Sequence, residues 1–247
     1  MTSGKLRAWN IAAGQFFFKY RNNIFPLVFA VSGLIMRPRV LLSNPRLDQL
    51  MMGAGAVIAV LGELLRLATI GFDYVDRGGK NKQVYASRLV AGGIYAHTRN
   101  PMYAGNALIA IGMSLVTGAP FAYVVIVPFF LFVYQAIVCA EEAYLRSRFG
   151  REYEEYCARV NRFIPSLRGA SRSFSGMRYD WKRALRQDLS TIAGLLMGLA
   201  LVPLWRTYFL NGWDAAKAAA PQAIIGAIGV GAFFGVVYTL KKQGKLA

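Results

Sequence analysis

The chain has 247 residues, of which 55% are hydrophobic and 17% charged, and its mean hydropathy is +0.36. These values and several long apolar runs exclude an ordinary soluble domain. Lys and Arg number 29 against 12 acidic residues, a net charge of +17, which suits either nucleic acid or an anionic membrane surface. The apolar runs favour the membrane, so we expect basic residues to anchor the cytoplasmic side and expect no nucleic-acid partner.

The N-terminus carries Lys5 and Arg7 but has no apolar core of signal-peptide length before Lys19 and Arg21. It also lacks a small-residue cleavage site, so we expect this segment to be retained. The first apolar stretch, residues 24–36, is short for a span. It crosses the bilayer only with tilting or snorkelling, or else forms a re-entrant segment.

Five further stretches approach the roughly 20 apolar residues that a spanning helix needs. These five stretches are residues 50–72, 101–116, 120–140, 189–210 and 222–240. Together with residues 24–36, they predict an all-α, polytopic helical membrane protein of about six transmembrane helices. Only about three residues, around Gly118 and Pro120, join the third and fourth spans, which predicts an antiparallel hairpin.

The Lys and Arg residues predict the orientation. With six spans, most of them fall on the side that carries both termini, and the positive-inside rule makes that side cytoplasmic. The three arginines between residues 37 and 46 argue for the opposite orientation if the first segment does not cross.

After the fourth span, large apolar residues recur at every third or fourth position: Leu145, Phe149, Tyr153, Tyr156 and Val160. The pattern predicts a cytoplasmic amphipathic helix at the membrane interface, which Gly150 breaks or bends. We therefore divide the chain into an N-terminal segment with the short first span, a membrane core, a basic cytoplasmic connector and a C-terminal two-helix extension, at residues 1–49, 50–167, 168–188 and 189–247.

Few ionisable or metal-binding side chains lie within the spans. Glu63 and Arg66 lie three residues apart on one face of the second span, as an internal ion pair or as part of a ligand site. Cys139 and Cys157 have no CxxC or Cys/His partner at metal-ligand spacing, so the sequence predicts neither a disulfide nor a metal site.

The segment GGIYAHTRNPMYAGN, residues 92–106, is the most informative in the chain. Asn100 and Pro101 form a typical N-cap and first-turn pair, so a helix is predicted to begin here. Arg99 beside the positive end of that helix suits a carboxylate or phosphate, although it could equally mark the cytoplasmic rim. His97 is the only histidine, and a single histidine is more often structural than catalytic.

Glu141 and Glu142 follow directly on the fourth span. An antiparallel hairpin returns them to the side of the membrane where Arg99 and Tyr103 lie, so two distant segments are predicted to converge. The carboxylates could hold a cationic group such as a sulfonium, accept a proton, or simply be solvated. Adjacent helical residues point about 100° apart, so the two need not share one role.

RNPMYAG at residues 99–105, followed by a hairpin and then Glu141-Glu142-x-x-Leu145, resembles the RHPxYxG and EExxL pattern of isoprenylcysteine carboxyl methyltransferases and phospholipid N-methyltransferases. The later FGREYEEYCARVNRFIP is similar to the segment that closes the catalytic core in that group, at Tyr153, Tyr156, Arg162 and Pro165. The resemblance covers roughly residues 50–165. The two C-terminal spans lie outside it.

The resemblance implies that S-adenosylmethionine binds on the cytosolic side and that a lipophilic acceptor enters from the bilayer. It assigns catalytic roles to Arg99 and Glu142, and cofactor binding to Tyr95, His97, Asn100, Pro101, Tyr103, Gly105, Glu141 and Glu142. Asn100 replaces the family histidine, and an amide forms hydrogen bonds but cannot carry a proton.

Methyl transfer from a sulfonium is an in-line displacement, so the protein must mainly align donor and acceptor and exclude water. A carboxylate acceptor needs no general base, whereas an amine acceptor would need Glu141 or Glu142 to remove its proton. Two other classes stay open. A sterol-type reductase would share RxPxYxG and YxxYCxRV but use NADPH, and a scaffold or transporter would be consistent with the Glu63/Arg66 pair.

Overall fold

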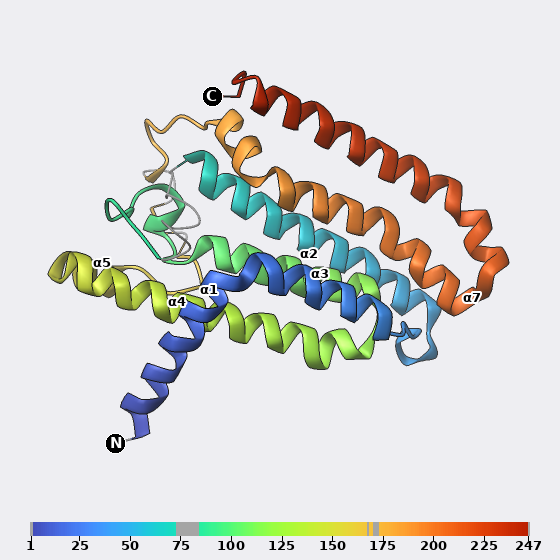
Figure 1. Ribbon diagram of the computed structural model, residues 1–247, viewed down its shortest axis with the longest axis horizontal. Helices are drawn as coiled ribbons and strands as arrows, with labels where there is room; N and C mark the ends of the chain where they lie inside the picture. The colour runs from blue at the N-terminus through green and yellow to red at the C-terminus, as the bar shows by residue number, and fades with distance from the viewer. Residues whose placement is uncertain (1, 73–83, 167, 170–172, 247) are drawn as a thin grey trace. The chain divides into compact units, whose positions relative to one another are not determined.

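In a computed structural model (Figure 1), we describe residues 2–72, 84–166, 168–169 and 173–246. Within these residues the fold is all-helical and contains no strand, so the predicted fold class is confirmed. The helices are α1 (Thr2–Ile35), η1 (Leu41–Ser43), α2 (Pro45–Phe72), η2 (Gly93–Ala96), α3 (Pro101–Thr117), η3 (Ala122–Ile126), α4 (Val127–Phe149), α5 (Arg151–Arg159) and α7 (Trp181–Lys242).

Among the described residues, three helices are long and apolar enough to cross a membrane: Pro45–Phe72, Ala122–Phe149 and Trp181–Lys242. The shorter α3 is also apolar. The stretch 24–36, predicted as a short span, forms the end of the 34-residue α1. Both C-terminal spans belong to α7, which folds back on itself in Figure 1 and leaves helical geometry at Gly212. The total of six spans stays a prediction.

The chain divides into two compact units, which are described separately. The first comprises Met1–Ile35, Phe72–Ala104 and Pro128–Arg178. The second comprises Met36–Gly71, Gly105–Val127 and Tyr179–Ala247. Both therefore combine the N-terminal, central and C-terminal thirds of the sequence.

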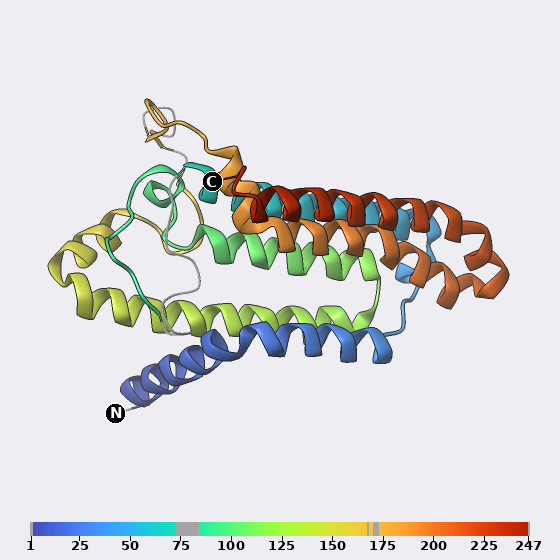
Figure 2. The same ribbon diagram turned by 45° about the horizontal axis from the view of Figure 1, so that its top comes forward.

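In the first unit, α1 lies along α4 (Figure 2). Phe18 packs on Val133 and Ile137 in the core of this unit. One turn earlier, a Cβ on Gly14 would lie 2.9 Å from the Cβ of Ala140, so the absent side chain allows the two helices to approach closely.

Gly150 separates α4 from α5 and adopts a φ of +49°. The predicted break is therefore confirmed. Val160, which we expected to continue the helical stripe, has an extended backbone beyond the end of α5. Arg146 and Glu154 form an ion pair across the break, with Nε and Oε1 2.7 Å apart.

Because a positive φ disfavours residues that carry a Cβ, we expect Gly150→Ala to destabilise the protein by about 1–2 kcal/mol. Thermal unfolding of the detergent-purified protein measures the effect. Gly53→Ala is the matched control, since a Cβ on this glycine within α2 would meet nothing within 4 Å. A fall in unfolding temperature as large for the control as for Gly150→Ala would contradict the backbone argument.

In the second unit, α2 and α3 pack closely through glycine. A Cβ on Gly62 would lie 2.6 Å from the carbonyl oxygen of Gly105, and a Cβ on Gly105 would lie 2.6 Å from Cγ of Arg66. Gly105, predicted to bind the cofactor, thus contacts α2 at a position where a side chain does not fit. Its role in cofactor binding stays a prediction.

Two buried arginines join the first arm of α7, the part that precedes Gly212, to the rest of the second unit. Arg66 of α2 donates from Nε to Oδ2 of Asp188 over 3.0 Å and also contacts Asn106 of α3. At the other end of the arm, Arg206 pairs with Asp48 and donates to the carbonyl of Val116. The C-terminal extension is therefore an integral part of this unit.

The Glu63/Arg66 pair is confirmed as an internal ion pair, with Oε2 and Nε 3.5 Å apart. The sequence did not show that Asp188 is a closer partner of the same guanidinium. Of the connector that was predicted to begin at residue 168, residues 170–172 lie outside the described residues.

Candidate active site in the first unit

The helix that was predicted to begin at Pro101 does so. The backbone carbonyl of Asn100 accepts a hydrogen bond from the N–H of Ala104 over 3.0 Å, as expected at an N-cap. The Asn100 side chain instead donates to the carbonyl of Arg162 over 3.0 Å. Asn100 thus connects the start of α3 to the segment that follows α5.

These two segments lie side by side through further hydrogen bonds. The N–H of Arg99 donates to the carbonyl of Asn161 over 2.9 Å, and the N–H of Ser166 donates to the carbonyl of His97 over 3.0 Å. Nδ1 of His97 also contacts the carbonyl of Ser166. His97 therefore has a structural contact at one ring nitrogen, while its buried Nε2 has no hydrogen-bond partner among the described residues.

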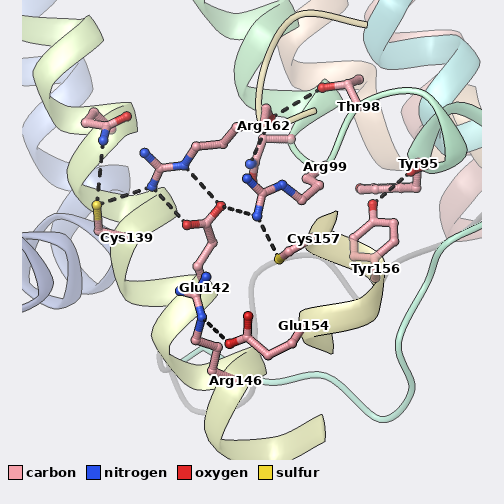
Figure 3. A network of polar contacts seen from close by, with 12 residues as sticks. Tyr95, Thr98, Arg99, Cys139, Glu142, Arg146, Glu154, Tyr156, Cys157 and Arg162 are labelled. Carbon is pink, nitrogen blue, oxygen red and sulfur yellow. Dashed lines mark hydrogen bonds and ion pairs between the residues drawn. The ribbon is translucent and has the colours of Figure 1, made fainter. Parts of the chain in front are cut away.

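Glu142 lies at the centre of the polar cluster in Figure 3. Arg162 donates from Nε to Oε1 over 3.0 Å, and its Nη2 lies 3.0 Å from Oε2, so the pair is bidentate. Nη1 of Arg99 lies 3.4 Å from Oε1 of the same carboxylate. The predicted convergence of Arg99 with the end of α4 is thereby observed within the first unit.

Two thiols flank this cluster. Nη1 of Arg99 donates to Sγ of Cys157 over 2.7 Å, and Nη2 of Arg162 donates to Sγ of Cys139 over 3.3 Å. Both cysteines are free thiols, and the sequence did not predict their contacts with these arginines. The spacing of Cys139 three residues before Glu142 could have placed it on the same helix face. No sequence signal linked Cys157 to Arg99.

Glu141 has a different partner from Glu142, as the angular offset of adjacent helical residues predicted. The hydroxyl of Tyr103 donates to Oε1 of Glu141 over 2.6 Å. The carbonyl of Tyr95 accepts a hydrogen bond from the hydroxyl of Tyr156 over 2.8 Å. Burial raises the pKa of the Tyr156 phenol, so Tyr156 remains a neutral hydrogen-bond donor.

A cavity of about 450 Å³ adjoins the Glu142 cluster. It is lined by Arg7, Ile11, Arg99, Cys139, Glu142, Arg146 and Arg162. A second cavity, of about 770 Å³, is more apolar and is lined by Ala12, Gln15, Phe16, Phe18, Lys19, Tyr20, Val84, Ala140, Ala143, Tyr144 and Ser147. The sequence had not identified the contribution of α1 to either cavity.

The first cavity carries excess positive charge. Glu142 is the only carboxylate among its lining residues, against four arginines. Glu154 lies outside the lining and balances Arg146. The described ion pairs therefore leave the arginines near Glu142 incompletely neutralised. Such a cavity favours a ligand that carries a carboxylate or another anion.

Together these features define the class of protein: an all-helical protein with helices apolar enough to cross a membrane and a cavity lined by arginines and a glutamate. The comparisons with known proteins place that site in a family context. Residues 49–152 match the sequence profile of the family described as phospholipid methyltransferase. No solved structure matches the chain.

Curated relatives match a similar segment. A probable protein-S-isoprenylcysteine O-methyltransferase from Oryza sativa subsp. indica is 31% identical over 118 residues, covering 46% of this chain and 60% of that protein. The protein-S-isoprenylcysteine O-methyltransferase of Schizosaccharomyces pombe is 33% identical over 115 residues, covering 43% of this chain and 46% of that protein. Protein-S-isoprenylcysteine O-methyltransferase B of Arabidopsis thaliana is 27% identical over 114 residues, covering 45% of this chain and 57% of that protein.

The chain thus spans between 46% and 60% of the length of these relatives. The resemblance inferred from the two motifs is confirmed over this segment. Helices α1 and α7 lie outside residues 49–152, as does Arg162.

Proposed function

We propose that the protein transfers a methyl group from S-adenosylmethionine to a lipophilic acceptor at the cytoplasmic membrane face. The observation that carries the proposal is the cluster of Arg99, Arg162 and Glu142 beside a cavity of about 450 Å³. Two of its three members lie in the segment that matches methyltransferases.

The residues present are compatible with S-adenosylmethionine, whose amino-acid part offers a carboxylate to a guanidinium and an ammonium to an oxygen acceptor. Nε of Arg99 is buried and has no hydrogen-bond partner among the described residues, so one donor is available for that carboxylate. When bound, the cofactor supplies an activated methyl group. Arg99 would orient the cofactor, and Glu142 would hold Arg99 in place.

A carboxylate acceptor of the prenylcysteine type fits the charge of the cavity better than an amine. The surplus of guanidinium groups attracts an anion and repels a protonated amine. Glu142 is engaged by two arginines, so its oxygens are occupied and poorly placed to remove a proton from an amine. The relatives named above are O-methyltransferases, which agrees with this choice.

The second cavity is suited to the apolar part of the acceptor. Its lining includes Phe16 and Phe18 of α1 together with Val84 and Ala140. In α4, Ala140 and Ala143 lie about 100° around the helix from Cys139 and Glu142. A lipid chain held there would therefore leave its polar end near the Glu142 cluster.

Calorimetric titration of the detergent-purified protein with S-adenosylmethionine tests the proposal. We expect saturable binding by the wild type and a loss of at least about tenfold in affinity for Arg99→Ala, since a charged hydrogen bond contributes about 1.5–3 kcal/mol. Arg151→Ala is the matched control, because the Arg151 side chain is 93% exposed. NADPH is titrated in parallel.

NADPH binding in place of S-adenosylmethionine would favour the reductase alternative. Binding of neither ligand would favour a scaffold or transporter. Equal affinity of Arg99→Ala and wild type for S-adenosylmethionine would remove Arg99 from the cofactor site.

A further inference from the structure

Helix α1 lies outside the segment that matches known methyltransferases, yet it supplies a wall of the polar cavity. Arg7, Ile11, Gly14 and Phe18 are spaced three or four residues apart. Such spacing places them on one face of a helix. Two members of this stripe line the cavity and two pack on α4.

The packing of α1 on α4 fixes the position of Arg7. Phe18 contacts Val133 and Ile137, whereas Gly14, four residues earlier, meets Ala136 and Ala140. The helices therefore run antiparallel, and residues earlier in α1 lie beside residues later in α4 (Figure 2). Two turns before Gly14, Arg7 reaches the level of Glu142, where both residues line one cavity.

Arg7 differs from the other arginines of this cavity in its partners. Arg99, Arg146 and Arg162 all pair with a glutamate. None of the ion pairs among the described residues includes Arg7, and its side chain is exposed. An arginine that lines a cavity without a protein counter-charge is suited to binding an anion that enters from outside.

We propose that Arg7 is a specificity-determining residue that binds the anionic group of the methyl acceptor, a carboxylate borne on a lipophilic molecule. The inference rests on the proposed methyl transfer and adds the residue that selects the acceptor. In that reaction a carboxylate oxygen forms a bond to the methyl carbon, the carbon–sulfur bond breaks, and its electron pair returns to sulfur. No proton moves.

The charge of the acceptor changes in this step. The carboxylate becomes a neutral ester and the sulfonium becomes a neutral thioether. The ion pair between Arg7 and the carboxylate is therefore lost, so the contact that selects the acceptor becomes weaker once the ester has formed. Arg7 thereby favours binding of the acid over binding of the ester.

The test measures binding of an N-acetylated, S-prenylated cysteine and of its neutral amide analogue to the full-length protein in detergent. We expect the wild type to prefer the carboxylate by about tenfold, the size expected for one charge-assisted hydrogen bond. Arg7→Gln should abolish this preference, and Arg7→Lys should retain part of it. Lys5→Gln is the matched control, since Lys5 lies about 200° around the helix from Arg7.

Steady-state kinetics with the same carboxylate provide a second readout. Arg7→Gln should raise KM about tenfold and leave kcat and the affinity for S-adenosylmethionine within twofold of wild type. An unchanged carboxylate preference in Arg7→Gln, or none in the wild type, would overturn the assignment. A matching loss of cofactor affinity would instead assign Arg7 to the cofactor. If the wild type binds the carboxylate preferentially but transfers no methyl group, the result would support the role of Arg7 in binding the carboxylate and contradict the proposed function.

Discussion

Glu142→Gln is expected to lower kcat/KM for methyl transfer by at least about 100-fold. The substitution removes the single negative charge that Arg99 and Arg162 share, at distances of 3.4 Å and 3.0 Å from its oxygens. A hydrogen bond to a charged group contributes about 1.5–3 kcal/mol, and a loss of about 2.7 kcal/mol in transition-state stabilisation corresponds to two decades of rate. Both guanidinium groups would lose the contact that orients them.

The measurement is initial-rate methyl transfer from radiolabelled S-adenosylmethionine, with thermal unfolding recorded on the same preparations. Glu155→Gln is the matched control, because Glu155 pairs with Arg151 on the exposed surface of α5. A Glu142→Gln protein that unfolds like wild type but has lost activity would separate a role in the site from a role in folding. Activity within twofold of wild type would show that the cluster is not the active site.

Asp188→Ala is expected to destabilise the protein by about 3–5 kcal/mol, because it leaves the Arg66 guanidinium buried without its closest carboxylate. Arg66 is 2% exposed and Asp188 is 0% exposed. Glu63 remains, but its Oε2 lies 3.5 Å from Nε of Arg66. For a chain of this size the unfolding temperature should fall by roughly 10 °C.

Thermal unfolding in a single detergent provides this comparison. Asp214→Ala is the matched control, because Asp214 forms an exposed ion pair with Lys217 and such pairs contribute little. The double variant Arg66→Met/Asp188→Leu should recover most of the lost stability, since apolar residues can replace a buried ion pair. An Asp188→Ala protein as stable as wild type would show that the Arg66–Asp188 pair does not stabilise the packing of α7.

The sequence determined the features that depend on local pattern. Apolar runs predicted an all-helical fold, Asn100-Pro101 marked the start of α3, and Gly150 marked the break after α4. The spacing of RNPMYAG and Glu141-Glu142 carried the resemblance that the family profile confirms. These features could be predicted because helix length, capping and turn chemistry are set by residues close in sequence.

Only the tertiary structure decided which side chains are partners. Arg7, Cys139 and Cys157 join the Glu142 cluster or its cavity, and Asp188 pairs with Arg66 across 122 positions of sequence. The structure also shows that Gly105 packs against α2, a contact that its motif did not predict. The register and crossing angle of two helices cannot be predicted from residues close in sequence, because they are set by close packing between helices that are distant in the chain. That packing decides which charged side chains share one cavity.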